Sequence, residues 1–219
     1  MMSEQEKEFR SYSLSDEWVG HLDTALKNIF LRHETQRAYP ANTMDEGVLS
    51  DQDKQQSAAL MRVNHAGEMA AQALYQGQSM MARDVSIHDK LRVASVEESD
   101  HLNWCRSRLD ELGEQPSKLD FFWYAGSFVM GVAAGAVGDR WNLGFLAETE
   151  HQVVHHLESH LQELPAQDAR SRAIVMQMRD DEQGHADLAE HLGAAVLPKS
   201  IKGLMKLTSK VMTTLAKRV

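Results

Sequence analysis

A spaced pattern of acidic residues and histidines constrains the fold of this chain more than any other feature. Glu-x-x-His occurs at Glu98–His101 and again at Glu182–His185. On an α-helix this spacing puts a carboxylate and an imidazole on one face, one turn apart. Each pair also lies in a stripe of apolar residues that repeats at helical spacing. Burying an ionisable pair in such a stripe is costly unless a partner compensates, and bound metal is a common partner.

Two single glutamates extend this pattern to a repeat. Glu68 precedes the first motif by 30 residues and Glu150 precedes the second by 32. One inward Glu from each of two helices, with Glu-x-x-His from each of two others, is the ligand set of ferritin-like di-iron and di-manganese bundles. Four carboxylates and two imidazoles suit paired iron or manganese better than zinc. The alternative is that these side chains are merely tolerated where helices pack together.

Three further residues are candidates for positions beside such a centre. Glu97 and Asp181 precede the two motif histidines by four residues, so we expect each to accept the free ring N–H of the histidine on its own helix. His156 follows the second single glutamate by six residues, and a surface position is its alternative. A third motif, Glu148–His151, lies off the apolar stripe of its helix, and we interpret it as solvent-exposed.

Composition favours helices and excludes several classes of protein. The chain has 219 residues, four prolines and 6% aromatic residues, and it shows no alternating runs of β-branched residues. A single cysteine, Cys105, excludes an internal disulfide and a Cys-x-x-Cys zinc module, and its place on an apolar stripe predicts burial. A net charge of −9 argues against nucleic acid as a partner.

The predicted fold is an all-α, ferritin-like four-helix bundle with additional N-terminal, hydrophobic and C-terminal amphipathic helices. Residues 1–49 form an N-terminal extension with one helix, which begins near Ser15 and ends before Pro40. Residues 50–198 form the metal-binding domain. Residues 199–219 form a basic amphipathic helix. The expected bundle helices are 51–82, 86–112, 143–164 and 168–192.

Two segments suggest contact with a lipid surface. Residues 121–138 carry no charge and contain Gly131-x-x-x-Gly135, a close-packing pattern. Three interpretations of this segment are open: a buried core helix, an element that dips into a membrane, or a membrane span. A lone span would place the two halves of the metal site on opposite sides of the bilayer. The segment 199–219 has five Lys, one Arg and no acid around an apolar face, which is typical of helices on anionic membranes or docked on a partner. Taken together, the two segments favour contact with a membrane.

Together these motifs resemble the 5-demethoxyubiquinone hydroxylase family of ubiquinone biosynthesis. The resemblance runs in order through residues 55–219 and rests on Val-Asn-His-Ala-Gly-Glu at 63–68, Glu-Glu-x-x-His at 97–101, the glycine-rich segment 126–138, Glu-Thr-Glu at 148–150 with His-His at 155–156, and Asp-Glu-x-x-His at 181–185. It places the six iron ligands of the family on Glu68, Glu98, His101, Glu150, Glu182 and His185. With two irons in this set, we expect Glu98 and Glu150 to bridge them.

The resemblance implies a peripheral membrane monooxygenase that hydroxylates the aromatic ring of a demethoxyubiquinol with O2. The expected partners are a polyprenyl quinol, a membrane surface, an unidentified donor of two electrons and other proteins of quinone biosynthesis. We expect a location on the cytoplasmic side of a bacterial cell membrane, with residues 121–138 and 199–219 as the walls and anchor of a slot for the lipid substrate. Rival functions are iron storage, peroxide scavenging, or a scaffold that binds quinone lipids and uses metal only for structure.

Overall fold

The structure, a computed structural model, describes residues 19–20, 23, 26–27, 31, 35–45 and 47–219. Within these ranges all regular elements are helical, so the predicted all-α class is confirmed. The N-terminal helix expected between Ser15 and Pro40 falls mainly outside the described residues. The elements are η1 (Pro40–Thr43), α2 (Asp51–Met81), α3 (Val85–Glu111), α4 (Asp120–Ala136), α5 (Asp139–Glu163), α6 (Ala169–His191) and α7 (Lys199–Ala216).

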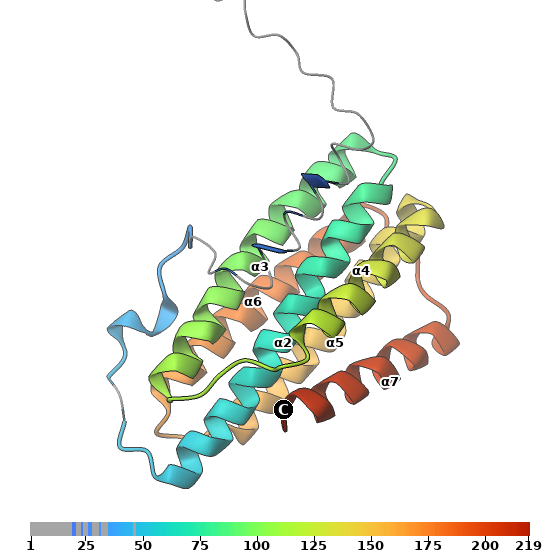
Figure 1. The fold of residues 1–219 in the computed structure, drawn as a ribbon. Coiled ribbons are helices and arrows are strands. Elements are labelled where there is room, and N and C mark those ends of the chain that lie inside the picture. The colour runs from blue at the N-terminus through green and yellow to red at the C-terminus, as the bar shows by residue number, and fades with distance from the viewer. Residues whose placement is uncertain (1–18, 21–22, 24–25, 28–30, 32–34, 46) are drawn as a thin grey trace, which may run out of the picture.

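Two helical hairpins make the bundle. Helices α2 and α3 form one hairpin, α5 and α6 form the other, and the four run side by side (Figure 1). Helix α4 connects the hairpins and lies along α2, while α7 crosses α2 and α5 near the C-terminus. These are the ferritin-like bundle and the two additional helices that the sequence predicts.

Local signals fix where the bundle helices begin and end. Ser50 and Asp53 form a capping box at the start of α2, in which each side chain accepts a hydrogen bond from the other residue's backbone N–H. Asp168 caps α6 by accepting a hydrogen bond from the Ser171 amide. Gly113, directly after α3, adopts a φ of +76°, which an L side chain rarely adopts.

Two apolar clusters flank the middle of the bundle. The first contains residues such as Met61, Leu109, Leu157, Ile174 and Met178, and the second contains residues such as Tyr75, Leu91, Leu143, Leu146 and Ala189. Each of the four bundle helices contributes to both clusters. The stretch between them is therefore enclosed by apolar packing on both sides, and the six predicted ligands lie in that stretch.

A buried ion pair fixes the two hairpins to each other at one end of the bundle. The Arg108 side chain of α3 is fully buried; its Nη2 donates to Asp168 Oδ1 at 2.9 Å and its Nε donates to Ser171 Oγ at 2.8 Å. Removing one partner would leave an uncompensated buried charge, which is strongly destabilising. Cys105, four residues from a histidine of the predicted site, is buried as expected.

Helix α4 differs from the interpretation of 121–138 as a buried core helix. Its narrow inner face, which includes Tyr124, Ser127, Gly131 and Gly135, is buried. Its other side is open, with Phe121, Phe122 and Val129 between 55% and 66% exposed. Burial of one face only leaves an apolar surface on the outside of the molecule. None of the helices in the described ranges is long and apolar enough to cross a bilayer.

Glycines let α4 approach α2 closely. A Cβ on Gly131 would lie 2.3 Å from the Leu74 carbonyl oxygen, and one on Gly77 would lie 2.4 Å from the Phe128 carbonyl oxygen. Both obstacles are backbone atoms, which cannot turn aside as a side chain can. The Gly-x-x-x-Gly pattern therefore acts here as a close contact between helices.

We expect Gly131→Ala to lower the free energy of unfolding by about 1–3 kcal/mol, because it forces α2 and α4 apart. Gly126→Ala on the same helix is the matched control, since a Cβ there meets no atom within 4 Å. That control should be neutral or stabilising, because alanine favours helix. Denaturant unfolding followed by circular dichroism measures both, and equal stability of the two variants would contradict the close contact.

Candidate metal centre

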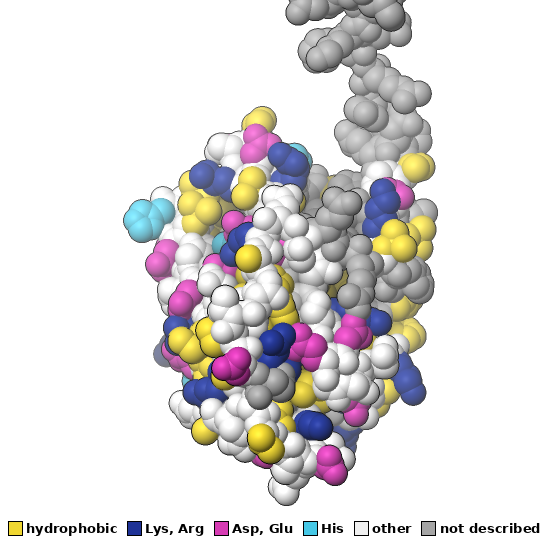
Figure 2. Space-filling view, turned by 90° about the vertical axis from the view of Figure 1, so that its left-hand side faces the viewer, with side chains coloured by type: hydrophobic (Ala, Val, Ile, Leu, Met, Phe, Trp, Pro, Cys, Tyr) yellow, Lys and Arg dark blue, Asp and Glu magenta, His cyan; other side chains and the backbone are white. Residues whose placement is uncertain are grey.

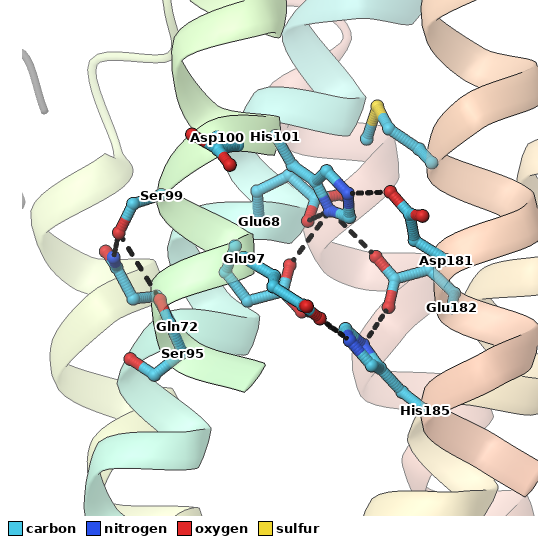
Figure 3. Close-up of polar contacts among 12 residues, drawn as sticks. Glu68, Gln72, Ser95, Glu97, Ser99, Asp100, His101, Asp181, Glu182 and His185 are labelled. Carbon is cyan, nitrogen blue, oxygen red and sulfur yellow. Dashed lines mark hydrogen bonds and ion pairs between the residues drawn. The ribbon is translucent and has the colours of Figure 1, made fainter. Parts of the chain in front are cut away.

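The six predicted ligands meet in the middle of the bundle. Among the described residues, Glu68, Glu98, His101 and Glu182 offer ligand atoms that all lie within 4.8 Å of one another, and Glu150, Glu182 and His185 form a second such group. All six side chains are buried. They come from α2, α3, α5 and α6, and Figure 3 shows several of them pointing toward one another between the helices. Their assignment as metal ligands stays a prediction.

Both histidines present the same ring nitrogen to the carboxylates. His101 Nδ1 lies 3.2 Å from Glu98 Oε2, 3.1 Å from Glu182 Oε1 and 3.5 Å from a Glu68 oxygen. His185 Nδ1 lies 3.0 Å from Glu182 Oε2 and 3.5 Å from Glu98 Oε1. The Nδ1 atoms are therefore the nitrogens available to a metal, and the Nε2 atoms point outward.

Two glutamates contact both histidines. Glu98 and Glu182 each direct one oxygen to His101 and the other to His185, so both span the two halves of the cluster. Glu150 belongs to one group only. The expectation that Glu98 and Glu150 bridge two irons stays a prediction, and the contacts of Glu182 with both histidines make it a further candidate for a bridge. Glu182 reaches both rings because the two Glu-x-x-His helices, α3 and α6, face each other across the cluster.

Glu97 and Asp181, which we call the outer acids, each bind the outward ring nitrogen of a histidine on the other helix. Asp181 Oδ2 lies 2.9 Å from His101 Nε2, and Glu97 Oε2 lies 2.6 Å from His185 Nε2 (Figure 3). The prediction that each acid serves the histidine of its own helix is wrong, although both acids do bind an outward ring nitrogen. The rings point across the bundle, so their outer edges reach the neighbouring helix. A ring N–H donated to a carboxylate fixes the tautomer and raises ligand basicity.

Tyr75 is a contributor that the sequence reasoning missed. Its hydroxyl donates to Glu150 Oε1 at 2.7 Å and lies 3.5 Å from His185 Nδ1. The spacing signal exists, because Tyr75 follows Glu68 by seven residues and so shares its helix face. Its phenol orients the Glu150 carboxylate toward the second half of the cluster.

The carboxylates crowd together in a way that perturbs their protonation. Burial raises the pKa of the Glu68 carboxyl, and burial together with the Glu182 charge raises the pKa of Glu150. For Glu182, burial is outweighed by contacts with both histidines, which lower the pKa below its ordinary value. For His185, burial is likewise outweighed by the bonds to Glu182 and Glu97, which raise its pKa to about 11.

This donor set fits a pair of divalent metals. Within the described part of the chain, the buried oxygens Glu98 Oε1 and Glu182 Oε1 accept no hydrogen bond, so both have lone pairs available to a cation. Protons on the histidines offset the carboxylate charges, and metal cations would replace these protons on binding. Mixed carboxylate and imidazole ligands, with oxygen in the majority, are typical of iron or manganese.

His156 does not join the cluster, so its candidacy beside the centre is wrong. Its ring lies 3.9 Å from that of His160, one turn further along α5. Burial lowers the pKa of His156 to about 4 and that of His160 to about 2. The nearest charges include Glu163 and Lys217, so this pair belongs to the packing of α5 near the end of α7.

The third Glu-x-x-His motif lies outside the cluster, but it is exposed as expected only at its histidine, because the Glu148 side chain is 12% exposed. His151 is exposed and pairs with Glu190 at 2.8 Å, while Glu148 pairs with Lys202 of α7 at 2.5 Å. The apolar stripe of a helix, and not the motif alone, separates a site residue from an exposed one.

An apolar pocket reaches the half of the cluster that contains His185. Its interior is narrow, with a free volume of about 20 Å³. Its walls come from α2, α3, α5 and α6, and they include Tyr75, Leu91, Leu143, Leu146 and Leu188. The expectation that 121–138 and the basic tail wall the substrate slot is therefore not met by this pocket.

A model of the family described as "Ubiquinone biosynthesis protein COQ7" matches residues 55–216. A relative from Chromobacterium violaceum is 53% identical over 204 residues, which cover 93% of this chain and 99% of its own. Relatives from Nitrosococcus oceani and Polynucleobacter asymbioticus are 52% and 50% identical, covering 95% and 94% of this chain and 98% and 100% of their own. All three are named 3-demethoxyubiquinol 3-hydroxylase.

The pairing of Glu97 with His185, and not with His101, can be tested by double-mutant cycles on the metal-free protein. We expect Glu97→Gln and His185→Gln to couple by about 1 kcal/mol in the free energy of unfolding, because they remove one hydrogen bond between them. The control cycle pairs Glu97→Gln with His101→Gln, on the same helix, and should be additive within about 0.5 kcal/mol. The reverse ranking of the two cycles would restore the same-helix pairing.

Proposed function

Because the chain belongs to the COQ7 family of ubiquinone biosynthesis proteins, we propose that it is a di-iron monooxygenase that hydroxylates the aromatic ring of a demethoxyubiquinol. The ligands in this proposal are the six residues of the cluster. Glu68 and His101 would hold iron at one end of the cluster and Glu150 and His185 at the other, with Glu98 and Glu182, which contact both histidines, between them.

One observation carries this assignment of the site. Six metal-binding side chains from four helices converge in a buried cluster, although they are spread over more than half of the sequence. Burying this many ionisable groups is unfavourable without a cation, so a structural role alone does not explain them. The names of the relatives supply the substrate class and the reaction.

The overall reaction balances with two electrons and two protons for each O2. One oxygen atom is inserted into a ring C–H bond to give C–OH, and the other leaves as water. The two irons, when bound, supply the binding and reduction of O2. The electrons come from outside the cluster, from a reduced partner or from the quinol itself.

The residues of this chain hold the centre and limit access to it. Asp181 and Glu97 accept the outward N–H groups of the histidines and keep each Nδ1 directed at the cluster. Tyr75 holds the Glu150 carboxylate. The two apolar clusters on either side keep bulk water from the reacting atoms.

The apolar pocket beside His185 is the proposed approach for the quinol ring, and because its free volume is about 20 Å³, its walls must move apart to admit the ring. Its lining is largely aliphatic, which suits an aromatic ring with a hydrocarbon tail. Lys90 is the cationic residue in the lining and can interact with a ring oxygen at the rim. The cluster and the pocket share Tyr75 and His185, so a ring in the pocket reaches the side of the centre that Glu150 completes.

The membrane part of the proposal rests on α4 and α7. On α7 the exposed apolar residues Leu204, Leu207 and Val211 lie among lysines, and α4 exposes phenylalanines. Both helices lie on the right-hand side of Figure 1. Figure 2 shows the molecule from the left of Figure 1, where acidic, basic and apolar side chains are interspersed. A basic amphipathic helix of this kind binds anionic lipid surfaces.

We propose a peripheral position at the cytoplasmic face of a bacterial membrane, which the apolar and basic surface of α4 and α7 and the lipid substrate support. A polyprenyl quinol stays in the bilayer, so the enzyme must meet it there. Other proteins of quinone biosynthesis are proposed as neighbours, because the same lipid passes from one enzyme to the next.

We expect His101→Ala to remove iron binding and to lower the turnover of demethoxyubiquinol by about two orders of magnitude or more, because a ligand is lost. His151→Ala is the matched control, since it removes the histidine of an identical motif on the surface. Iron analysis, Mössbauer spectroscopy and quinol hydroxylation measure the outcome. A wild-type protein without paired iron, or a His101 variant with normal turnover, would refute the proposed centre.

We expect Leu204→Glu to weaken binding to vesicles of phosphatidylglycerol and phosphatidylethanolamine by about tenfold, because it places a charge in the apolar face of α7. Val93→Glu is the control: Val93 is 54% exposed but lies on α3, on the left of Figure 1. Vesicle flotation measures both variants. Equal binding of the Leu204 variant and the wild type would exclude α7 as the contact.

A further inference from the structure

A short segment before the bundle lies against the metal centre through one arginine. The Arg37 guanidinium donates from Nε to Asp100 Oδ2 at 3.1 Å and from Nη1 to Asp181 Oδ2 at 2.8 Å. The backbone N–H of Gln36 donates to the other Asp100 oxygen at 2.8 Å. Asp100 lies on α3 and Asp181 on α6, so one side chain joins the two helices that bear the Glu-x-x-His motifs.

Arg37 acts on the same oxygen that holds a metal-site histidine. Asp181 Oδ2 is bonded both to Arg37 Nη1 and to His101 Nε2. Hydrogen bonds between charged groups are stronger than those between neutral groups, and a guanidinium is a rigid fork that can bind two acids in a fixed geometry. The position of Asp181, and with it the orientation of the His101 ring, therefore depends on Arg37.

The position of the proton on the His101 ring decides whether Nε2 is hydrogen-bonded to Asp181 or to Arg37. With Nδ1 directed at a metal, the neutral ring carries its proton on Nε2. That proton can be donated to Asp181 but not to Arg37, which has only donors. The Nη2 atom of Arg37, 3.1 Å from Nε2, thus lies beside the ring without bonding to it, and its influence passes through Asp181.

Aromatic packing completes the arrangement. The Arg37 guanidinium carbon lies 4.7 Å from the ring centre of Trp104, and the Trp104 ring lies 5.2 Å from that of His101. Trp104 is buried. A cation over an indole face is favourable, so Trp104 supports both the arginine and the histidine that the arginine serves.

We propose that Arg37 is a positioning residue of the metal centre, and that the segment before the bundle completes the centre by holding Asp181 against His101. Arg37 precedes residue 55, where the match to the family model begins. The inference rests on the proposed function only in taking the cluster as a metal site. It adds a residue from outside the four helices to that site.

The same segment has a second anchor that does not touch the centre, and this makes the inference testable. Arg170 on α6 donates to the Met44 carbonyl oxygen at 3.0 Å and lies over the Tyr39 ring at 5.8 Å. It also binds Glu111 through two hydrogen bonds. Replacing Arg170 disturbs the docking of the segment while leaving the Asp181–His101 contact in place.

The test uses the full-length protein freed of metal and titrated with Co(II), whose visible absorption reports its ligand environment. We expect Arg37→Ala to weaken Co(II) binding about tenfold and to change the absorption bands. The variant also leaves the buried Asp100 carboxylate without its cation, so the thermal midpoint of the metal-free protein falls and the titration is made well below that midpoint. Arg37→Lys should recover only part of the affinity, because an ammonium cannot hold both acids in one fork. Arg170→Ala should bind Co(II) within about twofold of the wild type.

Three results would overturn the inference. They are unchanged Co(II) affinity and spectrum in Arg37→Ala, full recovery by Arg37→Lys, and a loss in Arg170→Ala equal to that in Arg37→Ala. The last would mean that docking of the segment, and not the Arg37 contacts, supports the centre. Failure of the wild type to bind metal would refute the proposed function itself, so the two failures are distinguishable.

Discussion

The structure depends on the burial of four carboxylates and two imidazoles at one level of a helical bundle. Such a set is unfavourable in an apolar interior unless charges are balanced and lone pairs are used. The chain meets this requirement with two apolar clusters that hold the helices in place and with outer acids that bind the histidines. In the proposed function two metal cations neutralise the remaining negative charge. This explains why the six side chains point into the bundle.

Much of this arrangement could be predicted from the sequence, because it follows from periodicity along single helices. The position of Glu68 or Glu150 on an apolar stripe decides that the side chain points into the bundle. The same reasoning separates His185 from the exposed His151. Helix ends were also predictable, since capping acids and glycines mark them. These are local properties, which spacing in the sequence records directly.

Relations between helices could not be predicted in this way. Spacing suggested that Glu97 binds His101, whereas in the structure Glu97 binds His185 and Asp181 binds His101. Spacing also did not indicate that Glu182 contacts both histidines. Both differences arise from how α3 faces α6, which no periodicity on one helix contains. Arg37 is a stronger case, because nothing in its surroundings distinguishes it from a surface arginine until the segment lies on α3 and α6.

The two halves of the centre have different surroundings: one is covered by other side chains, and the other adjoins a pocket. The half that contains His101 is covered by Arg37 and Trp104, and Asp181 lies between the arginine and the ring. The half that contains His185 adjoins the apolar pocket and depends on Glu97, whose side chain is 41% exposed. Among the described residues, Arg37 and Trp104 cover the first half, and the apolar pocket adjoins the second. In the proposed function the quinol ring therefore approaches from the half that contains His185.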